Sequence, residues 1–164
     1  MTTKPSAPKP EKQLAGFIAK FERGHQALIR AARRILRARF VTAHELVYDN
    51  YNFFVIGYSP TLRPSDSIVS LTAGASGVGL CFIRGATLAD PDGLLLGSGR
   101  QTRFIRLESA SVLRRPAVER LIAAAIVQAR TPLRASGRRE LVIRSVSVKQ
   151  RPRRRAGAAS ARRR

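Results

Sequence analysis

The sequence has few residues of several kinds, and each shortage excludes a class of protein. Cysteine occurs once, at Cys81, so no internal disulfide can form and nothing indicates an oxidising compartment. No run approaches the roughly 18 consecutive apolar residues that a transmembrane helix needs. The N-terminus also lacks the apolar segment of a secretory signal. We therefore expect a cytoplasmic protein without a membrane partner.

Catalytic and metal-binding residue types are also scarce. The chain has two histidines and one cysteine, no GxSxG sequence, and no paired-cysteine or i, i+4 histidine spacing. His25 lies beside an apolar helical stripe and is expected to be structural, while His44 is expected at the surface of a loop. Cys81 lies in an apolar strand, where a thiol usually acts as a small hydrophobe. We predict no metal ligands, no cofactor and no catalytic residues, which disfavours an enzyme without excluding one.

Acidic residues are outnumbered by basic ones. The chain has 31 Lys plus Arg against 10 Asp plus Glu, a formal net charge of +21. Residues 134–164 carry 12 of the basic residues and a single acid, Glu140. A surplus of this size predicts attraction to polyanions and says nothing about fold.

Helical periodicity is found in three segments. Apolar residues recur at helical spacing up to Phe21, and again from His25 to Arg39, where arginines occupy the opposite face. A third helix is expected from Arg115-Pro116 to about Arg130, because proline is tolerated in a first helical turn.

Between the second and third helices, five segments are rich in β-branched and aromatic residues and are bounded by turn residues. They are residues 45–48, 52–58, 67–73, 78–83 and 101–107, with a hairpin turn expected at 74–77. Helices and strands that are segregated in this way predict an α+β fold with two N-terminal helices, an antiparallel sheet of about five strands and a C-terminal helix, spanning residues 13–133.

Both ends of the chain have the composition of disordered segments. Residues 1–12 are rich in proline and lysine, and residues 150–164 are low-complexity Arg, Ala and Pro. We therefore expect a disordered N-terminus and a disordered, basic C-terminal tail over residues 134–164. Residues 140–148 are β-prone, so this part of the tail either adds an edge strand or stays extended until it meets a partner.

Four blocks of the sequence resemble the YdhG-like bacterial family, a domain of unknown function. They are VYDNYNFFVIGYSP (47–60), ADPDGLLLGSGRQTRFIRLES (89–109), RPAVERLIAAAI (115–126) and RSVSVKQRPRR (144–154). The resemblance implies a compact α+β fold, a bacterial source and a cytoplasmic location. One branch of the family is described as frataxin-like iron chaperones, so iron is implied as a ligand by the resemblance alone.

Two groups of residues are candidates for binding. The GSGR turn at 97–100 places arginines close to a glycine-rich backbone, which predicts an anion or small-ligand pocket formed by Tyr48, Asn52, Arg100 and Arg103. The tail predicts a second site, because dense cation runs bind phosphate backbones by releasing counterions. Its candidate residues are Lys149, Arg151, Arg153, Arg154 and Arg155.

These observations leave two hypotheses open. The first is a non-enzymatic binding protein whose basic tail contacts nucleic acid or another polyanion. The second is a domain that handles a small ligand or a metal, in the manner of the iron chaperones. Oligomeric state is not indicated by the sequence.

Overall fold

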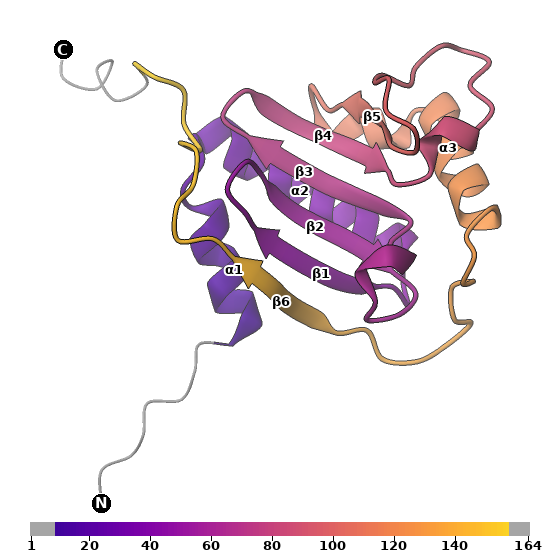
Figure 1. Cartoon of the computed structure of the whole chain (residues 1–164), viewed down its shortest axis with the longest axis horizontal. Coiled ribbons are helices and arrows are strands. Elements are labelled where there is room, and N and C mark those ends of the chain that lie inside the picture. Colours follow the sequence, from indigo (N-terminus) through magenta and orange to yellow (C-terminus); the bar gives the residue numbers. More distant parts are fainter. Residues whose placement is uncertain (1–8, 158–164) are drawn as a thin grey trace, which may run out of the picture.

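The structure, a computed structural model, describes residues 9–157 and has an α+β architecture (Figure 1). In chain order, the helices and strands are α1 (Pro10–Ile18), α2 (Arg23–Arg39), β1 (His44–Asp49), β2 (Phe54–Ser59), β3 (Val69–Gly74), β4 (Gly77–Phe82), β5 (Arg103–Arg106), α3 (Pro116–Val127) and β6 (Leu141–Val146). Three short 3-10 turns, η1 (Pro64–Asp66), η2 (Gly85–Thr87) and η3 (Ala110–Arg114), lie in the connections. The predicted α+β class, with two N-terminal helices and a C-terminal helix, is confirmed.

Each helix begins and buries residues as its sequence indicates. α1 and α3 both carry proline in the first turn, where its missing N–H group costs no hydrogen bond. α2 buries Ile29, Ala32 and Leu36 and exposes Arg30 and Arg34 on the other side, while Arg33 is half-buried. Because α1 begins at Pro10, the predicted disorder of residues 1–12 is wrong for its last residues, and residues 1–8 lie outside the described part of the chain.

The six strands form one mixed sheet in the order β5-β4-β3-β2-β1-β6. β1 to β5 pair antiparallel with their neighbours, as expected, and the hairpin turn between β3 and β4 falls at the predicted glycines. β6 pairs parallel with β1, with a bulge opposite Val47 and Tyr48. The predicted antiparallel sheet of about five strands is confirmed, and the segment at 140–148, for which an edge strand was one of two alternatives, adds a sixth, parallel strand.

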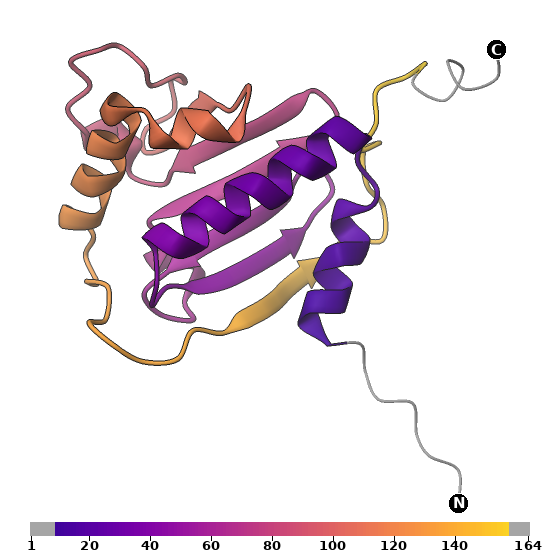
Figure 2. The same ribbon diagram turned by 180° about the vertical axis from the view of Figure 1, so that it is seen from behind.

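All helices pack against one face of this sheet, which leaves the other face open. Figure 1 looks onto the open face, and Figure 2 shows α2 lying along the opposite face, with α1 near the β6 edge and α3 beyond the β4 end. One inward-facing row of paired residues runs through the core, and its members are Val47, Ile56, Leu71, Leu80 and Ile105. Side chains alternate between faces along a strand, so the residues between these point to the open side.

Residues 147–155, which we call the C-terminal strap, continue from β6 and lie against the domain. The amide of Ser147 donates to the carbonyl of Asp49 at 2.9 Å, and the amide of Arg151 donates to the carbonyl of Tyr51 at 2.8 Å. The predicted disorder of the tail is therefore wrong for residues 150–157, because backbone pairing holds the strap beside the end of β1. Residues 158–164 lie outside the described part of the chain.

Among residues 9–157, no helix combines the length and the apolar character that crossing a membrane requires.

Candidate functional site: the open face of the sheet

The residues of the predicted anion pocket lie far apart on the sheet. Tyr48 is on β1 and Asn52 is in the turn that follows, whereas Arg100 precedes β5 and Arg103 opens it. Three strands separate β1 from β5. At about 4.8 Å per strand, the two pairs are roughly 19 Å apart. Arg103 also bonds its own loop, because its Nη1 donates to the carbonyl of Thr102 at 2.9 Å. The structure does not bring these four residues together.

Arg153 of the predicted polyanion-binding tail is buried. It is 4% exposed, and its Nη2 lies 2.9 Å from Oδ1 of Asp49, whose side chain is fully buried. Lys20 of the α1–α2 connection reaches the other carboxylate oxygen at 2.6 Å. Nε and Nη1 of Arg153 are buried without a hydrogen-bond partner among the described residues. This arginine fastens the strap to the domain instead of presenting charge to a partner.

Most of the other tail cations are held as well. Lys149 is exposed. The remaining contacts are Arg151 over the ring of Tyr51 at 5.9 Å, Arg154 to the carbonyl of Lys20 at 3.2 Å, and Arg155 to Glu22 at 3.2 Å. Most cations of this run contact the α1–α2 connection or the β1–β2 turn.

The buried Asp49 makes stability depend on acid pH. Burial alone would raise its pKa, but hydrogen bonds from Lys20 and Arg153 outweigh that effect and lower the pKa from the ordinary 3.8. Since the folded state then binds its proton less readily than the unfolded state, the stabilisation is present above about pH 4 and is lost as pH falls through the folded pKa. We expect a D49N variant to show a shallower loss of stability between about pH 4 and pH 2 than the wild type, measured by denaturant unfolding. Identical acid profiles would contradict this assignment.

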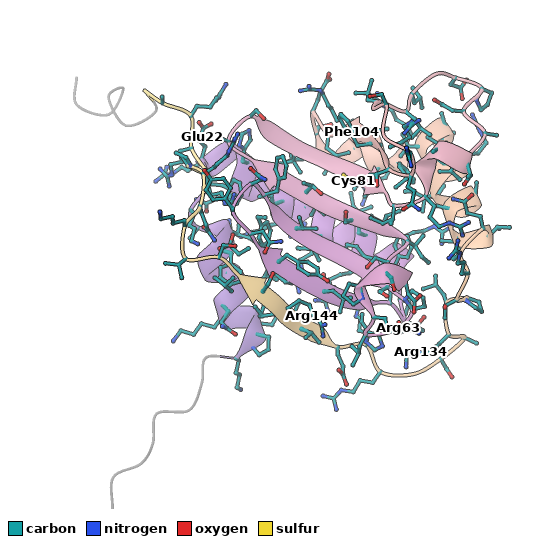
Figure 3. All side chains as sticks on the ribbon, viewed as in Figure 1. Glu22, Arg63, Cys81, Phe104, Arg134 and Arg144 are labelled. Atoms are coloured by element: carbon teal, nitrogen blue, oxygen red, sulfur yellow. The ribbon has the colours of Figure 1, made fainter. Side chains whose placement is uncertain are left out.

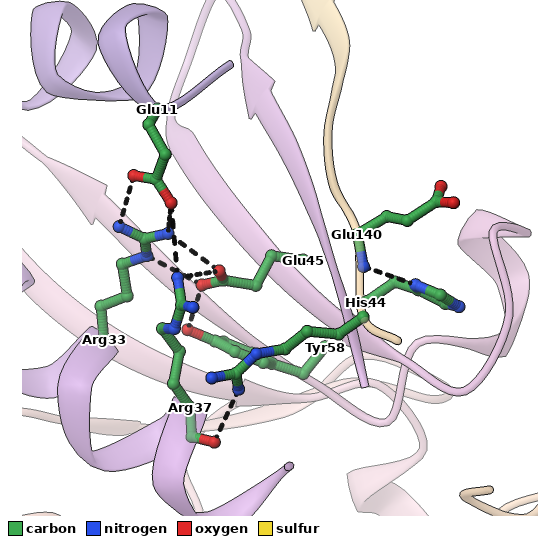
Figure 4. A network of polar contacts seen from close by, with 8 residues as sticks. Glu11, Arg33, Arg37, His44, Glu45, Tyr58 and Glu140 are labelled. Carbon is green, nitrogen blue, oxygen red and sulfur yellow. Dashed lines mark hydrogen bonds and ion pairs between the residues drawn. The ribbon is translucent and has the colours of Figure 1, made fainter. Parts of the chain in front are cut away.

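A second buried carboxylate, Glu45, joins the first two helices to the sheet (Figure 4). Arg33 binds both of its oxygens at 2.9 Å, and Nη1 of Arg37 lies 3.0 Å away. The hydroxyl of Tyr58 donates to it at 3.1 Å. Burial, together with the negative charge of Glu45, raises the pKa of Tyr58 well above 10, so the hydroxyl keeps the proton that it donates. Glu11 of α1 closes the network over Arg33 at 2.8 Å.

Other carboxylates in residues 9–157 also have internal partners. Glu22, Asp92 and Glu119 pair with arginines, Asp90 accepts backbone N–H groups, and Asp66 accepts the hydroxyl of Thr61. This leaves the side chains of Glu108 and Glu140, within the described residues, without an ion pair or hydrogen bond. No three residues of the His, Cys, Asp and Glu types gather in a metal-binding group within residues 9–157. The negative charge of the domain is therefore largely neutralised internally.

The open face carries no carboxylate at any strand position. Its residues, read from the strand register, are His44, Leu46, Tyr48, Val55, Gly57, Ser59, Ser70, Thr72, Gly74, Gly77, Gly79, Cys81, Phe104, Arg106, Val142 and Ser145. Ser67 lies against Gly57, because a Cβ at that glycine would be 3.0 Å from the Ser67 hydroxyl. The loop between β2 and β3 thus covers one part of the face and leaves the strip from Tyr48 towards Arg106 open.

Arginines border this face on several sides. Arg106 is exposed on β5 at one edge, and Arg144 is exposed in the bulge of β6 at the other. Arg63 and Arg134 lie towards the end that carries His44 (Figure 3). None of these four forms an ion pair with a carboxylate, although Nη2 of Arg134 donates to the carbonyls of Thr42 and Arg138, so their charges are not neutralised within the described residues.

Two titratable side chains on β1, His44 and Tyr48, have pKa values shifted by burial. His44 is 8% exposed and accepts the amide of Glu140 at 3.0 Å, so the predicted surface loop position is wrong. Burial and the nearby charge of Arg134 lower its pKa, which favours the neutral ring that this bond requires. The hydroxyl of Tyr48 is buried without a hydrogen-bond partner in the described residues, and its pKa is raised by that burial.

Sequence reasoning did not single out Phe104 and Arg144 as site residues. Both become visible once strands are assigned, because period-2 alternation then places Phe104 and Arg106 on one face of β5. To place Arg144 on a face, the bulge of β6 must also be known, and that bulge is a feature of the pairing between β6 and β1.

No family model matches the chain, and searches of curated proteins and of solved structures returned no match. The resemblance to the YdhG-like family stays a prediction.

Proposed function

We propose that this protein is a non-enzymatic binding protein for polyanions, nucleic acid in the first place, and that it binds them mainly through the domain and not through a free tail. The observation that carries the proposal is the distribution of charge. Carboxylates are mostly paired internally, while the open face lacks them and is bordered by Arg63, Arg106, Arg134 and Arg144. Unpaired cations of this kind attract phosphate backbones by counterion release.

The tail contributes less than its sequence suggests. Arg153 is buried, and Arg151, Arg154 and Arg155 are held by contacts with the domain. Among these tail residues Arg153 is the one that is buried, while Arg151, Arg154 and Arg155 stay exposed as they make their contacts. The charge of Arg155 is offset by Glu22, whereas the four arginines at the open face have no carboxylate partner, which supports the open face as the main binding surface.

Two variants with the same change in net charge distinguish the two surfaces. We expect R63S/R106S/R144S to weaken binding of labelled DNA or RNA by about tenfold or more at physiological salt, because three phosphate contacts are lost. We expect R162S/R163S/R164S to bind nearly as well as the wild type. Fluorescence anisotropy with the full chain measures both. For about four phosphate contacts, single-strand affinity should fall about 50-fold between 50 and 200 mM salt.

Either of two results would overturn this proposal. If the wild type fails to bind nucleic acid at physiological salt, the charge surplus has no role in nucleic-acid binding. If the terminal variant loses as much affinity as the open-face variant, the binding surface has been placed wrongly.

A further inference from the structure

A groove with a floor of small residues lies on the open face between two phenylalanines, and it continues round the end of the sheet to His25 and Leu28 of α2, where the unpaired Glu108 also lines it. Its floor is formed by Thr72 and Gly74 of β3 and by Gly79 of β4. Phe53 stands at one side, and Phe104 with Arg106 stands at the other. Phe53 is 50% exposed, so one side of its ring is accessible to a ligand.

The pairing of β3, β4 and β5 explains why few side chains project from the floor of the groove. Gly79 pairs with Thr72 on one side and with Arg106 on the other, and both pairs point to the open face. A side chain at Gly79 would bring its Cβ to 3.1 Å from the carbonyl oxygen of Ile105, a tight contact that glycine avoids. The ring of Phe53 leans over Gly74, where a Cβ would lie 3.3 Å from the ring. Flat rings therefore border a surface from which few side chains project.

We infer that this groove binds single-stranded nucleic acid, an inference that rests on the polyanion-binding function proposed above. Unpaired bases would stack on Phe53 and Phe104 above the floor. Aromatic side chains on an open sheet stack bases in a sequence-tolerant way, because every base has a π-face. Arg106 at one edge and Arg144 at the other would contact the phosphates.

Duplex fits this surface poorly. Reading a duplex takes an element that enters a groove, usually a helix or a two-stranded ribbon. The open face presents neither, and the bases of a duplex are stacked on one another and out of reach of Phe53 and Phe104. The distance across the six strands, about 24 Å, suits several nucleotides of an extended strand.

Alanine substitution of the phenylalanines tests the inference with the full chain. We expect F53A and F104A each to weaken binding of a labelled single-stranded oligonucleotide of about 20 residues by about tenfold, as loss of one stacked base would. The dependence of affinity on salt should not change, since no charge is removed. L62A removes another exposed apolar side chain and is the matched control. Because Phe53 is half-exposed, F53A is expected to fold normally, which thermal unfolding verifies.

A spectroscopic variant reports stacking directly. The chain has no tryptophan, so F53W introduces a single indole whose fluorescence should be quenched when a base stacks on it. Quenching by the single strand, with much weaker binding of the matching duplex, supports the inference. Unquenched fluorescence with binding retained, or unchanged affinity in both alanine variants, overturns the stacking site and leaves the polyanion function intact. Absence of any binding at physiological salt overturns both.

Discussion

Replacing Glu45 with alanine is expected to lower the free energy of unfolding by about 3–5 kcal/mol, the cost of leaving a buried ion pair without one partner. The carboxylate is 1% exposed and receives hydrogen bonds from Arg33, Arg37 and Tyr58. Its removal takes the buried partner away from the guanidinium of Arg33, whose side chain is only 15% exposed, and from the buried hydroxyl of Tyr58. Denaturant unfolding followed by circular dichroism measures the loss.

Glu11 is the matched control for Glu45, because it binds the same two arginines from the solvent side. Its side chain is 60% exposed, and exposed ion pairs contribute about 0–1 kcal/mol. Y58F should fall between the two, at about 1 kcal/mol, since it removes one hydrogen bond and leaves the ion pairs. A result in which E11A costs as much as E45A would show that burial is not what makes the network strong.

Replacing Arg153 with alanine is expected to cost about 3 kcal/mol or more, although the residue lies in a segment that reads as a disordered tail. The substitution leaves the fully buried side chain of Asp49 with Lys20 as its one remaining cation. It also removes the side chain that holds the strap against the end of β1, so protease cleavage within residues 147–155 should accelerate. K149A, exposed in the same strap, should stay within about 0.5 kcal/mol of the wild type.

A double variant distinguishes the loss of the Asp49–Arg153 attraction from the cost of leaving Asp49 buried with one partner fewer. In D49L/R153M both charged groups are replaced by apolar ones, and we expect much of the stability lost in R153A to return, because no buried charge is left unpaired. If R153A unfolds at the same denaturant concentration as the wild type, the strap does not stabilise the domain. The tail would then be free to serve as a polyanion anchor.

The elements with local signals were predictable from the sequence. Apolar residues at helical spacing identified α2, and proline in a first turn placed the start of α3, because both depend on residues within a few positions of one another. Glycines marked the β3–β4 turn for the same reason. Composition fixed the charge surplus, so attraction to polyanions could be expected before any fold was known.

Tertiary structure decided where the charges lie. Arg153 lies in the same run of arginines as Arg154, yet it alone in the strap is buried, because it reaches Asp49 at a separation of 104 residues. The anion pocket failed for a related reason. Tyr48 and Arg103 belong to strands whose separation is set by sheet order, and no local pattern encodes that order.

The open face depends on both the local sequence and the tertiary packing. Period-2 alternation assigns Gly79 and Phe104 to a face, but only the packing of all the helices on the opposite side decides which face stays open. Local sequence thus determined the elements and the total charge of this protein. Long-range pairing of β6 and of the strap with β1 decided which arginines are buried and which remain available, because burial depends on contacts between residues far apart in the chain.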